Sequence, residues 1–296
     1  MKKELYHYPI SVLLILICIS IIGIIFGTFF DLNISKSIVD TNLWFGGFIE
    51  SFGLTIPFIM TSLAGVLLFK GLFPSEKKSI QILGIVLFFV CIGASIYFAG
   101  DYLTSKYTYG ITFQTGIAYL IGSLYILLST SLFMYVIKSG NKKGLIITAC
   151  IIIGVILIQL GVIELLKNIA SRPRYRYLIS SQNIANDTFK YWYEFTPFSA
   201  KDDNFKSWPS GHTATSGVML CLPLITPYVK KEHKYTKVIL TIIGVIYPLL
   251  VGFYRLRYGA HYLSDVSFGL LIVTLIYTLC LFIGSKVDGK LERKDG

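Results

Sequence analysis

The sequence predicts an all-α protein, a polytopic transmembrane helical bundle of about eight helices. Of the 296 residues, 54% are hydrophobic and 15% are charged, and the mean hydropathy is +0.67, well outside the balance of an ordinary soluble domain. A bilayer core about 30 Å thick takes roughly 20 apolar residues per helix. Eight stretches meet this requirement, at about 8–30, 53–73, 79–99, 116–137, 144–166, 209–228, 237–254 and 263–284.

The first stretch follows a start with two lysines, as a secretion signal does, but it is long and runs into Asp31 without a small-residue cleavage site. We therefore expect a retained helix. No tandem repeat, low-complexity tract or flexible linker interrupts the stretches that follow. Two longer connections, 31–52 and 167–208, are rich in aromatic residues. We expect an aromatic belt at the headgroup level or, at 167–208, a lid that guides a lipid into a site.

The distribution of lysines predicts the topology. Lysines gather in alternate connections, whereas the opposite connections at 31–52 and 100–115 carry only Lys36 and Lys106. Basic connections stay on the cytoplasmic side. We therefore expect a multi-pass protein of the cell membrane with both termini in the cytoplasm. The lysine-rich connections are 2–3, 70–78, 138–143, 230–237 and 286–294.

Several other basic residues fall on the outer side against this rule, and a phosphate-binding site would supply the reason. The net charge of +11 follows this membrane pattern and does not indicate nucleic-acid binding. The five cysteines lie in apolar stretches at no metal-ligand spacing, so neither a disulfide nor a metal site is expected. The outer basic residues are Lys167, Arg172, Arg174, Arg176, Arg255 and Arg257.

The first candidate motif joins Lys167 and Arg174 at the end of the fifth stretch. The spacing of seven residues places both on one helical face if the helix persists, and Pro173 argues against persistence. Alone, such a pair is also typical of basic side chains that reach toward the membrane surface. Glu164 lies about one turn inside the same stretch, where a charge needs a partner. We expect it to pair with Lys167 and orient it, or to line a wet cavity.

The second candidate motif is Pro209-Ser210-Gly211-His212 at the start of the sixth stretch. Proline suits the first helical turn, and small residues leave backbone N–H groups uncovered, so this helix start is a candidate anion site with His212 beside it. An ordinary helix start with a histidine at the membrane boundary is the alternative.

The third candidate motif contains Arg255, His261 and Asp265. A spacing of four places His261 and Asp265 on one helical face, so the carboxylate can accept a hydrogen bond from one ring nitrogen and leave the other free as a nucleophile. A charge pair that caps an interfacial helix is the alternative. The lysine pattern places all three motifs on the outer face, which favours one shared site for a phosphate group.

These motifs resemble those of the type 2 phosphatidic acid phosphatase superfamily, the membrane lipid phosphatases related to glucose-6-phosphatase and the vanadium haloperoxidases. Lys167 and Arg174 match its first motif, Ser210, Gly211 and His212 its second, and Arg255, His261 and Asp265 its third. Tyr175 and Tyr254 stand where the family normally has proline and serine. The resemblance implies a six-helix lipid-phosphatase core over 79–296, with motifs at 167–174, 209–212 and 255–265, plus two additional N-terminal helices and an outer interfacial loop over 1–78.

The resemblance also implies a mechanism without metal or other cofactor. Lys167, Arg174, Arg255 and the N–H groups of Ser210 and Gly211 would hold the phosphoryl group. His261, oriented by Asp265, would attack phosphorus, and His212 would protonate the leaving oxygen before water hydrolyses the phosphohistidine.

Several functions stay open on the sequence alone. The first is a metal-independent phosphatase whose partners are membrane lipids and whose substrate is an isoprenyl diphosphate carrier, a phosphatidylglycerophosphate-type lipid or a phosphatidate-type lipid. The second is a phosphotransferase, in which an alcohol resolves the same intermediate. The third is a transporter that only binds phosphate headgroups, although its charges would be expected at interrupted helices near the midplane. A vanadium peroxidase fits a membrane setting least well.

Overall fold

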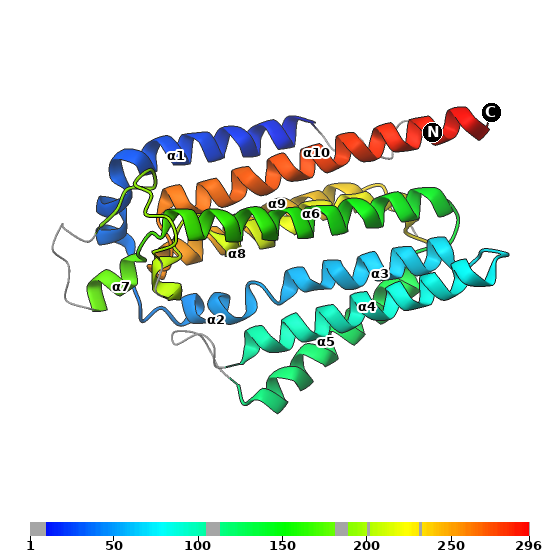
Figure 1. The fold of residues 1–296 in the computed structure, drawn as a ribbon, viewed down its shortest axis with the longest axis horizontal. Helices are drawn as coiled ribbons and strands as arrows, with labels where there is room; N and C mark the ends of the chain where they lie inside the picture. The colour runs from blue at the N-terminus through cyan, green and yellow to red at the C-terminus, as the bar shows by residue number, and fades with distance from the viewer. Residues whose placement is uncertain (1–9, 105–112, 181–188, 200–201, 231–232, 296) are drawn as a thin grey trace.

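The structure is a computed structural model that describes residues 10–104, 113–180, 189–199, 202–230 and 233–295. These residues form a bundle of long helices, which confirms the all-α fold class (Figure 1). Lys2, Lys3, Lys106 and Lys231, which contributed to the topology prediction, lie outside the described residues. The elements in order are α1 (Ile10–Ile38), α2 (Trp44–Phe52), η1 (Ile56–Phe58), α3 (Ile59–Leu72), α4 (Lys78–Leu103), α5 (Thr115–Val136), α6 (Lys142–Ala170), α7 (Tyr175–Ser180), η2 (Asp203–Phe205), α8 (Gly211–Ser216), η3 (Gly217–Tyr228), α9 (Thr236–Arg257) and α10 (Leu263–Asp295).

Seven segments of the described chain are long and apolar enough to cross a membrane, and they correspond to seven of the eight predicted stretches. The eighth, predicted at about 209–228, is α8 followed by the 3₁₀ helix η3, and not one α-helix. Pro223 and Pro227 lie inside η3 and have no N–H for a helical ladder. The six residues of α8 and the 12 of η3 rise about 1.5 and 2.0 Å each, so together they extend roughly 33 Å, about a bilayer core.

The η3 segment is the centre of the bundle. All of its residues except Pro227 are buried, and they pack with apolar side chains of α3, α6 and α10. The outward faces of α1, α4, α5 and α9 carry exposed Ile, Leu, Val and Phe side chains. In water such faces would be unfavourable, so their exposure is consistent with contact to lipid.

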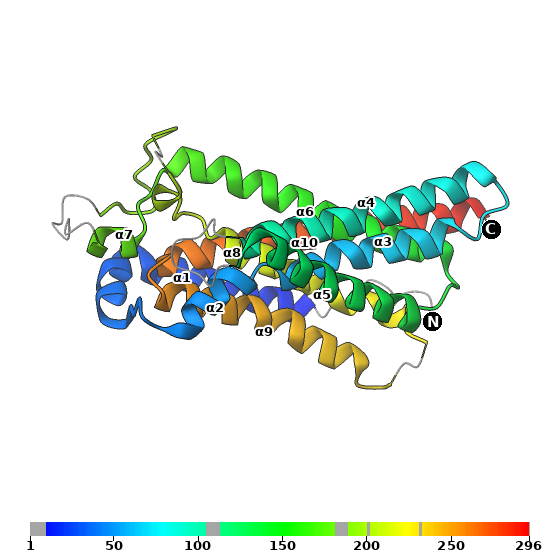
Figure 2. The same ribbon diagram turned by 90° about the horizontal axis from the view of Figure 1, so that it is seen from below.

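The lysine-rich ends and the three motifs lie at opposite ends of the bundle. Lys70 lies in the last turn of α3, Lys78 begins α4 and Lys142 begins α6. These helix ends point to the right in Figure 1, whereas the end of α6, the start of α8 and the start of α10 meet at the left. Figure 2, turned by 90°, places α7 and the end of α1 at that same left end. The helices therefore carry the motifs to one end of the molecule.

Candidate active site

The first motif is built where α6 stops. The helix ends at Ala170, and Ser171 takes a left-handed conformation with φ of 46°. The helix therefore does not persist from Lys167 to Arg174, as Pro173 indicated, and the two residues do not share a helical face. Both side chains nevertheless line the same cavity of about 270 Å³. Arg174 is held by Asp203, with Nε 3.0 Å from the main-chain oxygen and Nη2 2.7 Å from Oδ2.

The second motif joins this cavity through Gly211 and His212, which also line it. A Cβ atom on Gly211 would lie 3.0 Å from Lys167 Nζ, so the absence of a side chain permits this close approach. Ser210 caps α8, and its Oγ accepts hydrogen bonds from Thr213 N at 3.3 Å and Thr213 Oγ1 at 2.9 Å.

One part of the predicted anion site needs correction. The Ser210 N–H donates to the main-chain oxygen of Asp265 at 3.0 Å, so it is not available to a phosphate as predicted. The reason is that the first turn of α10 packs against the residue before α8 and satisfies that donor. The Ser210 backbone thus ties the second motif to the third.

The third motif places His261 and Asp265 differently from the prediction. His261 precedes α10, which begins at Leu263, so the helical spacing of four does not apply. Its Nδ1 lies 2.6 Å from the Ser207 main-chain oxygen and 3.8 Å from Asp265 Oδ2. The direct hydrogen bond predicted between His261 and Asp265 is therefore wrong. A carbonyl oxygen only accepts, so Nδ1 donates and the neutral ring carries its lone pair on Nε2.

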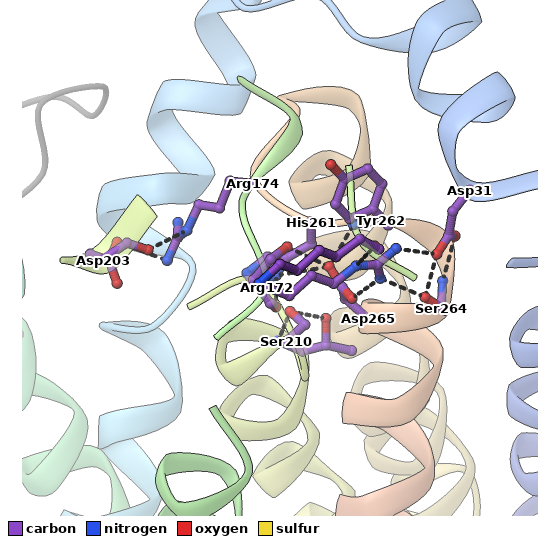
Figure 3. A network of polar contacts seen from close by, with 12 residues as sticks. Asp31, Arg172, Arg174, Asp203, Ser210, His261, Tyr262, Ser264 and Asp265 are labelled. Carbon is purple, nitrogen blue, oxygen red and sulfur yellow. Dashed lines mark hydrogen bonds and ion pairs between the residues drawn. The ribbon is translucent and has the colours of Figure 1, made fainter. Parts of the chain in front are cut away.

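Asp265 supports this arrangement indirectly. Its carboxylate accepts hydrogen bonds from Arg172 Nη1 at 2.6 Å, Ser207 Oγ at 2.5 Å and Tyr262 N at 2.8 Å (Figure 3). It thus fixes Ser207, whose carbonyl oxygen accepts a hydrogen bond from the His261 ring. It also fixes Tyr262, which follows His261 in the chain. The Asp265 side chain is 0% exposed, so these contacts form in a low-dielectric environment.

Burial, and then the positive charges of Arg255, Arg174 and Lys167, hold the pKa of His261 well below its usual range. The ring is therefore neutral at physiological pH. Its Nε2 is buried and has no hydrogen-bond partner among the described residues. The centroid of the His212 ring lies 6.4 Å from that of His261. This arrangement provides a neutral nitrogen nucleophile among cations, with a second histidine close by.

The predicted cation cluster also has unused donors. Within the described part of the chain, Arg174 Nη1 and both Nε and Nη2 of Arg255 are buried without a hydrogen-bond partner. Buried donors of this kind are rare unless a ligand or water satisfies them. Their presence beside His261 favours an anionic ligand.

Glu164 pairs with Lys206 and not with Lys167 as predicted. Its Oε1 lies 2.8 Å from Lys206 Nζ and 3.2 Å from Asn168 Nδ2, and no ion pair with Lys167 occurs among the described residues. The side chain is 57% exposed, so it faces out of the buried cluster toward Lys206. Glu164 still lines the cavity, as the alternative interpretation expected.

The sequence interpretation missed two carboxylates that hold the site, and it named Arg172 only as one of the outer basic residues, without its partners. Asp31 and Glu50 are buried carboxylates that bind arginines, and Arg172 is a buried arginine between two carboxylates. The signal that could have found them is that an ionisable residue beside an apolar membrane stretch needs a partner.

The aromatic connection packs partly against α1 and α10, and part of it faces outward. The ring centroids of Trp192 and Phe268 are 4.7 Å apart, and Trp192 Nε1 donates a hydrogen bond to Thr28 Oγ1 at 2.9 Å. Tyr193 and Phe198 are exposed. The belt and the lid both stay consistent with this placement.

A comparison with models of protein families tests the resemblance that the three motifs indicate. The family model described as PAP2 superfamily matches residues 146–287. This range begins in the first turns of α6 and includes most of α10. This part of the chain is similar to the PAP2 superfamily. The match confirms the resemblance drawn from the three motifs, all of which lie inside it. No curated protein and no solved structure matches the chain.

Members of the PAP2 superfamily are phosphatases, so the match supports a phosphoric ester hydrolase in a multi-pass membrane protein. The match begins at residue 146, and the predicted division into 1–78 and a six-helix core over 79–296 stays a prediction.

Proposed function

We propose that the protein is an integral membrane phosphatase that hydrolyses the phosphate or diphosphate monoester of a lipid through a phosphohistidine at His261. The observation that carries this proposal is the buried, neutral His261 with a free Nε2 among cations that have unused donors. Lys167, Arg174 and Arg255 would bind the phosphoryl oxygens, and each charge-assisted hydrogen bond would contribute about 1.5–3 kcal/mol.

The reaction has two steps. His261 Nε2 attacks phosphorus, the bond from phosphorus to the leaving oxygen breaks, and His212 supplies the proton to that oxygen. Water then attacks the phosphohistidine, His212 takes its proton, and the phosphorus–nitrogen bond breaks to release phosphate and neutral His261. Electrostatic stabilisation by the fixed cations accounts for most of the rate acceleration in such a site.

The experiment measures phosphate release by the purified protein in detergent with EDTA, across a panel of lipid phosphates and diphosphates. Isoprenyl diphosphates, phosphatidylglycerophosphate and phosphatidate represent the three proposed substrate classes. We expect release with at least one of them and a trapped phosphoprotein that is acid-labile and alkali-stable. Release that is lost in EDTA and restored by magnesium would contradict the metal-independent mechanism.

Product analysis separates the alternatives. A phosphotransferase would phosphorylate an added alcohol in place of water. A transporter would bind the lipid headgroup and release no phosphate. The charged residues of the three motifs lie at the end of α6, beside the start of α8 and at the start of α10, which meet at one end of the bundle (Figure 1), and this placement away from the midplane favours an enzyme over a transporter.

We also propose that the active site faces out of the cytoplasm, because it lies at the end opposite the lysine-rich helix termini. In a variant without the five native cysteines, Ser199→Cys near the site should react with a membrane-impermeant maleimide in intact cells. Glu76→Cys, between α3 and α4, should react only after permeabilisation. Both positions are exposed, so the pair is matched. The opposite labelling pattern would place the site inside.

A further inference from the structure

The N-terminal helices lie outside the matched region 146–287, yet each inserts one buried carboxylate among its arginines. Asp31 of α1 is 2% exposed and Glu50 of α2 is 0% exposed. Removing a charge from water is costly, and a buried ion pair seldom repays this cost in stability. Ionisable residues within membrane segments are functional by default. The two carboxylates therefore call for a role in the site.

Glu50 binds two arginines and contacts a histidine of the site. It lies between Arg176, at 2.8 Å from Nη1 and 3.3 Å from Nη2, and Arg255, whose Nη1 it also contacts. Its main-chain oxygen lies 3.4 Å from His212 Nε2. Only one nitrogen of Arg255 contacts Glu50, while Nε and Nη2 keep no partner among the described residues. Glu50 thus fixes the guanidinium and leaves its other donors for a ligand.

Asp31 binds a different arginine of the site, Arg172. Its Oδ2 lies 3.0 Å from Arg172 Nη2, and its Oδ1 accepts from Ser264 N at 3.0 Å. Figure 3 shows Arg172 lying between Asp31 and Asp265. The other end of that guanidinium, Nη1, donates to Asp265 Oδ1 at 2.6 Å.

The contacts continue from Asp265 to the nucleophile. Asp265 accepts from Ser207 Oγ, and the Ser207 main-chain oxygen accepts from His261 Nδ1. An unbroken series of hydrogen bonds therefore joins α1 to the ring that we propose attacks phosphorus.

The backbone of both helices is fitted closely to the site. A Cβ on Gly27 of α1 would lie 2.6 Å from Ser264 N, and one on Gly46 of α2 would lie 2.4 Å from Tyr258 Cδ2. Only glycine permits these approaches. Tyr254 stands where the resembled family normally has serine. The centroid of its ring lies 4.7 Å from the ring centroid of Phe45 of α2. The helices are thus held against the site at several independent points.

We infer that Asp31 and Glu50 are positioning residues of the active site, so that α1 and α2 complete the catalytic apparatus. Glu50 positions Arg255 for phosphate binding, and Asp31, through Arg172 and Asp265, positions His261 for attack. This inference rests on the proposed function. It gives two different kinetic signatures, because one carboxylate acts on binding and the other on the chemical step.

The experiment compares Glu50→Gln and Asp31→Asn with wild type, in phosphate release and in inhibition by inorganic phosphate. Glu50→Gln should raise KM and the inhibition constant of phosphate by about tenfold or more, with a smaller change in kcat. Asp31→Asn should lower kcat by roughly 10- to 100-fold and leave the phosphate constant within about threefold. Glu76→Gln, at an exposed position between α3 and α4, is the matched control and should change neither.

A purely structural role would change both variants in the same way, together with their thermal unfolding, and that outcome would overturn the inference. Glu50→Asp keeps the charge but is one methylene shorter, so it should fold and recover part of the phosphate affinity lost in Glu50→Gln. If Glu50→Gln does not fold, Glu50→Asp decides the assignment of Glu50. Its shorter side chain should raise the inhibition constant of inorganic phosphate above the wild-type value, and an unchanged constant would contradict the assignment. Asp31→Glu serves in the same way for kcat.

Failure of the proposed function gives a different result. A wild type that releases no phosphate from any lipid removes the proposed function and the Asp31 assignment with it. The Glu50 assignment is then decided by binding alone, measured as thermal stabilisation by inorganic phosphate. Equal binding by wild type and Glu50→Gln would overturn it, as would a wild type that does not bind phosphate.

Discussion

Replacement of His261 by alanine is expected to lower phosphate release by roughly 10³-fold or more, because it removes the nitrogen that forms the bond to phosphorus. The cations that bind the phosphoryl group stay in place, so the inhibition constant of inorganic phosphate should change little. Initial rates on the best lipid of the panel, together with phosphate inhibition, measure both quantities. The phosphoprotein should also disappear.

The matched control is His233→Ala, which removes an exposed histidine beyond η3 and should leave the rate unchanged. His212→Ala offers an internal comparison. Its defect should shrink for aryl phosphates, because a good leaving group does not need protonation, whereas the His261→Ala defect should not. Substantial phosphate release by His261→Ala would show that the nucleophile is another group.

The prediction that the motifs lie close together depends on motif identity and on the order of the membrane segments. Lys167, Arg174 and His212 line one cavity because alternate helix ends return to the same end of a bundle. The lysine pattern is enough to predict that return.

The contacts that the sequence predicted wrongly depend on where helices begin and end. Asp265 was expected to bind His261 directly, but α10 starts two residues after His261, and the Ser207 carbonyl takes that hydrogen bond. Spacing rules hold only inside a helix, and sequence signals fix helix ends to within a few residues.

The contributions of Asp31 and Glu50 could not be predicted from the motifs, since they are separated from their partners by more than 100 residues. Nothing in the spacing of distant residues reports which helices pack side by side. The structure supplies this information through the packing of α1 on α10 and of α2 on α9.

Arg172→Met is expected to destabilise the protein by about 3–5 kcal/mol, the usual cost of leaving buried charges without their partner. Arg172 is 1% exposed and binds Asp31 and Asp265, whose side chains are 1% and 0% exposed. Methionine fills a similar volume but supplies no donor, so both carboxylates lose a hydrogen bond. Unfolding in detergent, followed by circular dichroism over a denaturant series, measures the change in free energy.

The control for this prediction is Lys206→Met, which breaks the exposed pair with Glu164 and should change the free energy of unfolding by less than about 1 kcal/mol. Adding Asp31→Asn to Arg172→Met removes one of the two stranded charges, so the double variant should be more stable than Arg172→Met alone. Strictly additive losses would mean that Asp31 and Arg172 act independently. A stable Arg172→Met variant with wild-type kcat would contradict the inference that Asp31 positions His261 through Arg172. In that case Asp265 would hold Ser207 and the nucleophile without its arginine.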